Sequence, residues 1–249
     1  MRLLVFFTVL SLGASLQAGI FLGNGNSGFG GVLGPGQLEL TNSGDTVNAT
    51  LTTGGSFNDA LVIYIDSQAG GFSDIDLFGD TADSLRAAIS GFDGTNKSQL
   101  NFAAGFEADY AIALSPDGGI NFGGQWELAA GLNNSLIFQN SVNLSPTGGG
   151  TAGSSPFTFD FALSSLGIAA GDSFDFVATY LNPTNAFRSD EAIGDGIGPG
   201  NPGTATSTFT NFQTFNSTAA AVPEPGHGIL LALATGFCFW QRRSKRAVI

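Results

Sequence analysis

The sequence predicts a mainly β protein: an antiparallel β-sandwich of jelly-roll type with one short helix, followed by a hydrophobic helix at the C-terminus. Short segments alternate apolar and polar residues, which is the pattern of strands buried on one face. Glycine- and proline-rich turns separate these segments, and only one stretch has a helical pattern. Many short strands with a single helix favour a sandwich or jelly roll, and the 23 phenylalanines suit its core.

The strands are expected to begin near Gln37. In residues 46–53 and 156–164 every second side chain is apolar, so both segments are expected to be half-buried strands. Residues 60–66 are apolar on both faces and are expected to form a central strand. Further strands are expected within residues 106–115, 172–182 and 205–215.

One helix is expected over residues 82–89. Asp80 or Thr81 is the expected N-terminal cap, and Asp83 would lie in the first turn, where a negative charge is favourable. Gly91 follows the last helical residue and is the expected stop.

The N-terminal residues have the layout of a secretory signal peptide. Arg2 precedes an apolar run, and small and polar residues follow up to Ala18. We expect cleavage after Ala18 and export of the chain that follows. An apolar run this short is not expected to serve as a permanent anchor.

Residues 19–36 are rich in Gly and Asn and are expected to form a flexible lead-in or edge loop. Gly23, Gly25 and Gly28 match a formal GxGxxG pattern. A dinucleotide site would need a helix directly afterwards, whereas Pro35 and further glycines follow here. The pattern therefore does not predict a nucleotide cofactor.

The charge distribution limits the partners. Of the eight Lys and Arg residues, only Arg86, Lys97 and Arg188 lie outside the terminal segments, whereas Glu224 is the only one of 20 acidic residues inside them. The exported part is thus strongly acidic, which excludes nucleic-acid binding and disfavours anionic membrane surfaces. A cationic partner or a divalent metal ion is compatible with this charge, and so is a simple role in solubility.

Side chains for catalysis are few. The single histidine, His227, and the single cysteine, Cys238, both lie in the C-terminal tail, so the body has neither a Ser-His-Asp nor a Cys-His arrangement. Lys97 lies in a polar stretch that is typical of a solvated turn.

Paired carboxylates, as in glycoside hydrolases, are the remaining option for catalysis. They are represented by Glu107 and Asp109, with Glu127 nearby. An acidic chain of this length contains such residues by chance, so we expect that the protein is not an enzyme.

A calcium site is a candidate near the predicted helix. Asp74, Asp76 and Asp80 are closely spaced oxygen ligands around a glycine, and Asp83 follows them. Their spacing does not match the calcium loop of a helix–loop–helix motif. Helix capping explains Asp80 and Asp83 without a metal ion, so both interpretations stay open.

Trp126 is the candidate for carbohydrate binding. An exposed aromatic face beside polar groups is the usual sugar platform, and Gly123, Gly124 and Gln125 precede this residue. The alternative is a tryptophan buried in the sandwich core.

The body resembles a known class of secreted domains. The stretches GFEADYAIAL (105–114) and SDEAIG (189–194), within residues 37–216, are broadly similar to the DOMON and family-nine carbohydrate-binding class of β-sandwiches. The resemblance implies a binding or matrix role, and it transfers no active site.

The C-terminal tail resembles the PEP-CTERM sorting signal of Gram-negative bacteria that make exopolysaccharide. A Pro-Glu-Pro motif precedes an apolar block at 229–240 and a basic cluster, in the order that the family requires. The motif is Pro223, Glu224 and Pro225, and the cluster is Arg242, Arg243, Lys245 and Arg246. The resemblance implies cleavage by an exosortase-type enzyme.

The physical properties of the tail agree with this resemblance. Prolines keep the motif extended, and the basic end favours a cytoplasmic location. The apolar block is shorter than the roughly 20 residues of an easy membrane span, so we expect only a transient anchor. The protein is then expected at the cell surface or in the extracellular matrix, with exopolysaccharide as a further partner. The expected organisation is a signal peptide (1–18), a lead-in (19–36), a sandwich (37–216), a linker (217–221) and a sorting signal (222–249).

Overall fold

The computed structural model describes residues 18–116, 122–145 and 156–219. The chain divides into two units, Met1–Ala219 and Ala220–Ile249, and every described residue belongs to the first. The predicted C-terminal helix lies outside the described residues. Within the described part, no helix has the length and apolar character needed to cross a membrane.

The smaller sheet has four antiparallel strands in the order β1-β2-β3-β9. Their bounds are Ala18–Leu22 (β1), Gln37–Ser43 (β2), Thr46–Thr52 (β3) and Phe157–Ala162 (β9). A tight turn joins β2 to β3, and Gly44 supplies its left-handed backbone (φ 60°). β3 and β9 show the predicted alternation of buried and more exposed residues.

The larger sheet has seven strands, in the order β11-β10-β4-β6-β7-β8 with β13 also paired to β10. The bounds are Ala60–Asp66 (β4), Tyr110–Ser115 (β6), Phe122–Glu127 (β7), Ile137–Asn143 (β8), Ser173–Asn182 (β10), Phe187–Ile193 (β11) and Gln213–Asn216 (β13). All pairs in this sheet are antiparallel. β4 lies between β10 and β6 and is buried on both faces, which confirms the predicted central strand.

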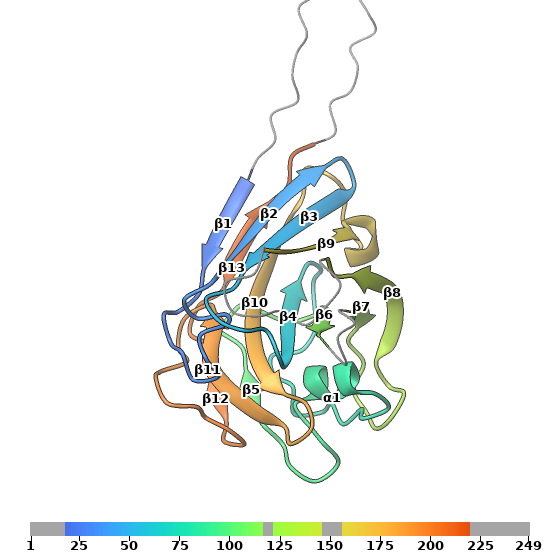
Figure 1. The fold of residues 1–249 in the computed structure, drawn as a ribbon. Helices are drawn as coiled ribbons and strands as arrows, with labels where there is room; N and C mark the ends of the chain where they lie inside the picture. Colours follow the sequence, from blue (N-terminus) through green and yellow to red (C-terminus); the bar gives the residue numbers. More distant parts are fainter. Residues whose placement is uncertain (1–17, 117–121, 146–155, 220–249) are drawn as a thin grey trace, which may run out of the picture. The chain divides into compact units, whose positions relative to one another are not determined.

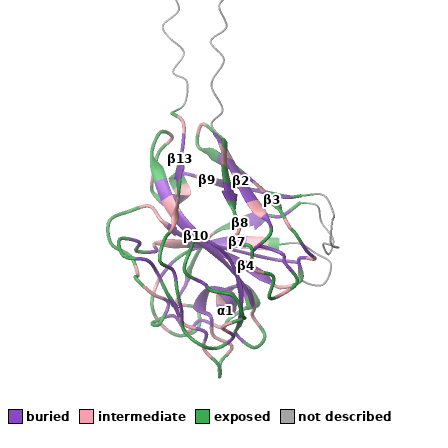
Figure 2. Ribbon diagram, turned by 90° about the vertical axis from the view of Figure 1, so that its left-hand side faces the viewer, coloured by how far each residue is buried: buried purple, intermediate pink, exposed green. Residues whose placement is uncertain are grey.

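Both faces of the larger sheet are covered, so the described body has three layers. One hydrophobic core lies between the two sheets and includes Phe157 and Phe176. A second core on the opposite face packs Tyr64 and Trp126 against helix α1 (Ser84–Ser90) and neighbouring loops. Figure 2 shows β2, β3 and β9 on one side of the buried strands β4 and β10, with α1 on the other side. Over the described residues, the predicted mainly β, antiparallel fold with one short α-helix is confirmed.

The last predicted strand is divided. β12 (Ser207–Thr208) pairs in parallel with β5 (Leu100–Asn101), and β13 joins the large sheet separately. A single continuous strand over 205–215 was therefore the wrong prediction.

Helix α1 starts later than predicted. Its N-terminal cap is Asp83, whose extended backbone (φ −150°) lets its carboxylate accept the N–H of Arg86 at 2.8 Å. Asp80 and Thr81 were the wrong caps, because Asp80 accepts the N–H groups of Ala82 and Leu136 and Thr81 donates to Asn133. Gly91 ends the helix in the left-handed conformation (φ 58°), as predicted.

The glycine-rich segment 19–36, predicted to be a flexible lead-in or an edge loop, is part of the fold and lies at the edge of the small sheet. β1 extends the small sheet, and Val32 and Leu33 are buried in the core between the sheets. Gly34 is required by close approach, since a Cβ there would lie 1.9 Å from the carbonyl oxygen of Asn26.

Candidate functional site

An open groove beside helix α1 is the strongest candidate for a ligand site. Its volume is about 400 Å³, and it is lined by residues 76–79, Phe92, Lys97, Gly131 and Leu132. Backbone hydrogen bonds hold its two walls together: the N–H of Gly79 donates to Gly131 (2.8 Å), and the N–H of Gly131 donates to Leu77 (2.9 Å). A volume of this size with mostly apolar walls is typical of small-molecule sites.

Two leucines at this groove are unusually exposed. Leu77 has 65% and Leu132 78% of its surface accessible. Phe78, by contrast, is buried and packs edge-on against Phe72. Exposed leucines beside a concave surface are the feature that a ligand with an apolar face would cover.

Lys97 supplies the polar part of the groove. Its ammonium group donates to the carbonyl oxygens of Ile75 (2.8 Å), Ser90 (2.9 Å) and Phe78. Burial lowers the pKa of Lys97 to about 8, against the opposing influence of Asp76. The prediction of a solvated turn was wrong for this side chain, because its acceptors come from the loop before α1 and from the end of that helix.

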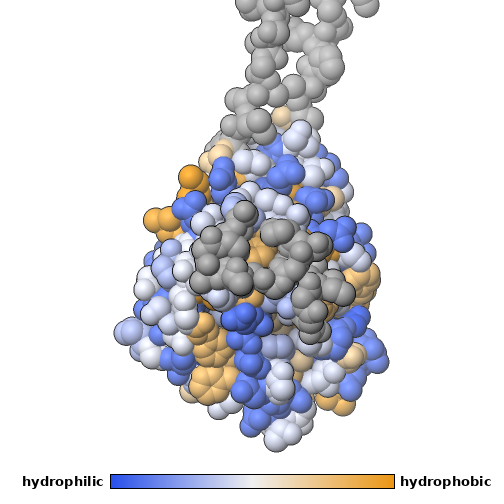
Figure 3. Space-filling model, in the orientation of Figure 1, coloured by the Kyte–Doolittle hydropathy of each residue, from blue (hydrophilic) through white to orange (hydrophobic). Residues whose placement is uncertain are grey.

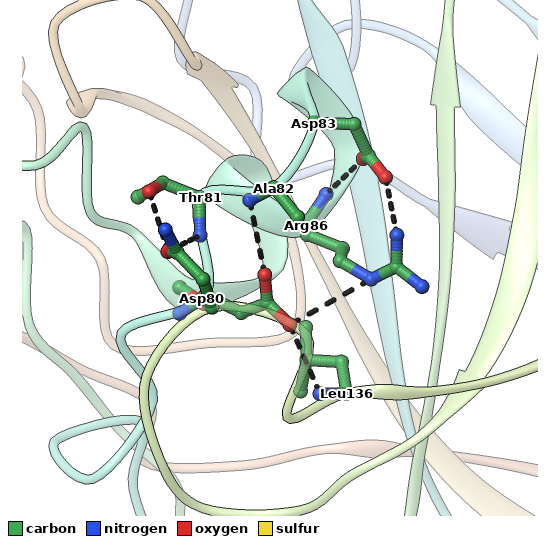
Figure 4. A network of polar contacts seen from close by, with 8 residues as sticks. Asp80, Thr81, Ala82, Asp83, Arg86 and Leu136 are labelled. Carbon is green, nitrogen blue, oxygen red and sulfur yellow. Dashed lines mark hydrogen bonds and ion pairs between the residues drawn. The ribbon is translucent and has the colours of Figure 1, made fainter.

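The proposed calcium ligand Asp80 is already occupied by protein donors (Figure 4). Its carboxylate accepts the N–H of Ala82 (3.0 Å) and the N–H of Leu136 (3.1 Å). The Arg86 side chain lies 3.6 Å from the same group. Burial acts to raise the pKa of Asp80, but the backbone hydrogen bonds and Arg86 outweigh it, so the pKa is lowered.

The other predicted calcium ligands do not join Asp80. Asp74 accepts the backbone N–H of Asp76 (2.9 Å), and Asp76 accepts the side chain of Gln99. Asp83 caps α1 and pairs with Arg86 at 2.6 Å. Over the ranges that the structure describes, no three His, Cys, Asp or Glu side chains are grouped closely enough to hold a metal ion.

Trp126 lies in the second core, as the alternative interpretation expected. Only 3% of its surface is exposed. Its ring packs edge-on against Phe138 (5.7 Å between centroids), and the guanidinium of Arg86 lies 5.8 Å from its centroid. The ring therefore does not form an exposed sugar platform in this structure.

Asp109, of the predicted carboxylate pair, and Glu127 bind neighbouring residues of the fold. Asp109 accepts the backbone N–H groups of Ser67 (2.9 Å) and Gln68 (2.8 Å). Burial raises the pKa of Asp109 despite these bonds, and the nearby charge of Glu107 adds to the increase. Glu127, on β7, accepts the side chain of Gln139 at 3.1 Å.

A like-charged pair lies close to this group and was not predicted from the sequence. Asp66 on β4 and Asp175 on β10 are direct partners in the strand register. Both line a shallow polar pocket of about 250 Å³. Burial raises the pKa of Asp66, and the charges of Asp109, Asp175 and Glu107 raise it further. The sequence signal was that each aspartate lies near one end of an apolar strand.

All three cationic side chains of the described body are engaged internally. Arg188 is fully buried and donates to Thr179 (2.6 Å) and to the carbonyl and hydroxyl oxygens of Ser98 (3.4 and 3.3 Å). Lys97 bonds three carbonyls, and Arg86 pairs with acidic side chains. On the face shown in Figure 3, hydrophilic residues separate the hydrophobic areas from one another.

The residues of the predicted sorting signal lie outside the described part of the chain. They are Pro223, Glu224, Pro225, Arg242, Arg243, Lys245 and Arg246. The predicted signal-cleavage residue is described: Ala18 is the first residue of β1 and pairs with Thr41. Cleavage after Ala18 would leave the other four residues of β1 in the body.

Comparisons with known proteins return no relatives. No family model matches the chain, and searches of the curated proteins and of the solved structures find no match either.

Proposed function

We propose that the chain is an exported, non-enzymatic protein of the cell envelope or extracellular matrix. A C-terminal signal holds it briefly in the inner membrane, and an exosortase-type enzyme then removes that signal. The observation that carries the proposal is the order of parts in residues 222–249: Pro-Glu-Pro, an apolar block and a basic end. The basic end would retain the tail on the cytoplasmic side and leave the body outside.

The arrangement of the chain ends supports this proposal. Ala18 pairs with Thr41 on β2, and Thr218 bonds the next residue of β2, Asn42. The start of β1 and the end of β13 therefore lie at the same end of the body (Figure 1). Both export signals would be attached at one pole, which leaves the rest of the surface accessible to matrix components such as exopolysaccharide.

The roles of the candidate carboxylates support the non-enzymatic part of the proposal. Asp80 and Asp109 use their oxygens to bind backbone N–H groups, as side chains do when they fix loops. We also propose a jelly-roll type of connection for the two sheets and a short membrane helix for the tail.

Mass spectrometry of the secreted protein tests the proposed processing. The full chain would be produced in a Gram-negative host with and without an exosortase-type enzyme. We expect a mature protein that starts at Gly19 and has lost the apolar block, and a Glu224→Ala variant that keeps it. A mature protein that still ends at Ile249 in the presence of the enzyme would overturn the proposal.

The second candidate function is a carbohydrate- or calcium-binding module of the cell surface, and the groove at Leu77 and Leu132 favours the carbohydrate alternative. A sugar ring has an apolar face that these leucines can cover, while Lys97 and Asp76 border the same space. Glycan arrays and calorimetry, with calcium and with a chelator, test this function. Binding that Leu132→Ser weakens and that Leu22→Ser, a comparably exposed leucine on β1, leaves unchanged would support it.

A further inference from the structure

Asn42, on β2, is a buried polar residue that joins the C-terminal end of the body to the small sheet. Its side chain is 2% exposed. The amide oxygen accepts the backbone N–H (2.8 Å) and the hydroxyl (3.1 Å) of Thr218, and the amide nitrogen donates to the carbonyl oxygen of Thr218 (3.0 Å). The same nitrogen also donates to Gly44 at 3.1 Å. One side chain therefore satisfies both backbone groups of Thr218, as a neighbouring strand would.

The neighbouring contacts extend this attachment by one residue in each direction. Thr41 is the register partner of Ala18, so β2 also holds the first residue of β1. Ser217 bonds Asp172 through its backbone N–H (3.1 Å) and its hydroxyl (2.7 Å). Ser217 and Thr218 were assigned to a linker from the sequence, but they belong to the folded body.

We propose that β2 anchors both ends of the body, Gly19 through its partner Leu40 and Thr218 through Asn42, and that Asn42 determines the first peptide bond of the C-terminal tail that a peptidase can reach. Peptidases need an extended, unpaired segment, and the Asn42 contacts keep residues up to Thr218 from becoming one. The anchor thus keeps residues up to Thr218 within the folded body.

The sequence places the Pro-Glu-Pro motif very close to this anchor. Only residues 219–222 separate Thr218 from Pro223. Five extended residue steps span at most about 17 Å, so an enzyme that acts on the motif must approach the pole of the body that carries Asn42. The identity of that enzyme rests on the proposed function, whereas the anchor itself does not.

Limited proteolysis of the full chain with a broad-specificity protease, analysed by mass spectrometry, tests the anchor. In the native protein we expect the first C-terminal cuts beyond Ala219. In Asn42→Ala we expect first cuts within 213–219, at a rate raised roughly tenfold, because two backbone groups of Thr218 lose their partners. Asn48→Ala, at an exposed position opposite Thr41 on β3, is the matched control and should keep the native pattern.

Thr218→Pro provides a second variant that leaves β2 unchanged. It removes the N–H that Asn42 accepts, and it lies beyond the last strand, so the core should still form. We expect the same shift of cuts into 213–219. Native cutting patterns in both variants would overturn the proposal.

The intact mass of the exported protein separates this proposal from the proposed function. A chain that keeps its C-terminus in the presence of an exosortase-type enzyme, but shows shifted cuts in Asn42→Ala, would refute the processing and support the anchor. Normal processing with unshifted cuts would support the proposed processing and refute the anchor.

Discussion

The backbone N–H of Leu33 donates a 2.6 Å hydrogen bond to the carboxylate of Glu191, across 158 residues of sequence. The same carboxylate accepts the N–H groups of Phe29 (2.8 Å), Gly31 (3.1 Å) and Gly34 (3.3 Å). Glu191 is fully buried on β11, and four backbone donors surround its charge. Glu191 therefore holds residues 29–34 against the body, while Asn24, Asn26 and Gly28 bind the neighbouring Asp190.

Replacing Glu191 should destabilise the protein strongly. In Glu191→Ala the buried N–H groups lose their acceptor, and we expect a loss of about 3–5 kcal/mol in the free energy of unfolding. Glu191→Gln should lose nearly as much, because its NH₂ group would face N–H donors. Urea denaturation measures the loss, and hydrogen exchange should rise first in residues 29–34.

Asp195→Asn is the control for Glu191, because this exposed aspartate follows the same strand. It should leave the unfolding midpoint unchanged. If Glu191→Gln unfolded at the midpoint of the native protein, the result would contradict the stabilising role that the structure gives to these hydrogen bonds.

The stability should fall at high pH because of buried tyrosines. Burial raises the pKa of Tyr64 from 10.0 to about 12, and burial also raises the pKa of Tyr180. Between pH 10 and pH 12 the unfolded chain releases the Tyr64 proton while the folded chain keeps it. The contribution of Tyr64 to the free energy of unfolding is therefore complete below pH 10. It is lost as the pH rises through the pKa of Tyr64 in the folded protein.

Ultraviolet absorbance of phenolate, recorded together with circular dichroism, measures this effect. We expect Tyr64 and Tyr180 to ionise only as the protein unfolds, and Tyr64→Phe to show a shallower loss of stability above pH 10. Ionisation of all three tyrosines in a folded protein at pH 10 would contradict the prediction.

Removing one charge of the Asp66–Asp175 pair should stabilise the fold. Asp175→Asn keeps an oxygen that can accept the hydroxyl of Thr214, and it ends the repulsion of directly opposed charges. We expect a gain of about 0.2–1 kcal/mol in the free energy of unfolding at neutral pH, which shrinks as salt screens the native pair. Asp160→Asn, which faces the uncharged Asn48 on β3, should show no comparable gain.

Asp80 should be needed for stability whether or not calcium is present. Asp80→Ala removes the acceptor of Ala82 and Leu136 and a partner of Arg86, so we expect a loss of about 2–4 kcal/mol. Thermal unfolding with calcium chloride and with a chelator measures it, and Asp160→Ala, at an exposed position on β9, is the control. A loss that appears only with calcium would instead identify Asp80 as a metal ligand.

Much of the strand content followed from local patterns. The alternation in β3 and β9, the fully apolar β4 and the helix stop at Gly91 depend on neighbours in the sequence, so they could be predicted. β7 and β8 were not predicted, because Gly123 and Gly124 in β7 and the polar residues of β8 have low strand propensity. Pairing with β6 places β7 in the sheet.

The candidate groove could not be predicted, because distant segments form it. The sequence around Lys97 predicts a solvated side chain. In the structure its amine donates to the carbonyl oxygens of Ile75 and Ser90. Residues 131–132 then close the groove from a different part of the chain. A sequence pattern reports neither contact.

The sequence by itself determined the mainly β class and the acidic character of the body, and it predicts the order of the proposed export signals, since each depends on composition or on short-range spacing. Only the tertiary structure decided that Trp126 is buried, that Asp80 binds backbone rather than standing free, and that Glu191 and Asn42 hold the two ends of the body. The physical reason is that a buried polar group must find a partner, and in this fold the partners are supplied by residues far away in the chain.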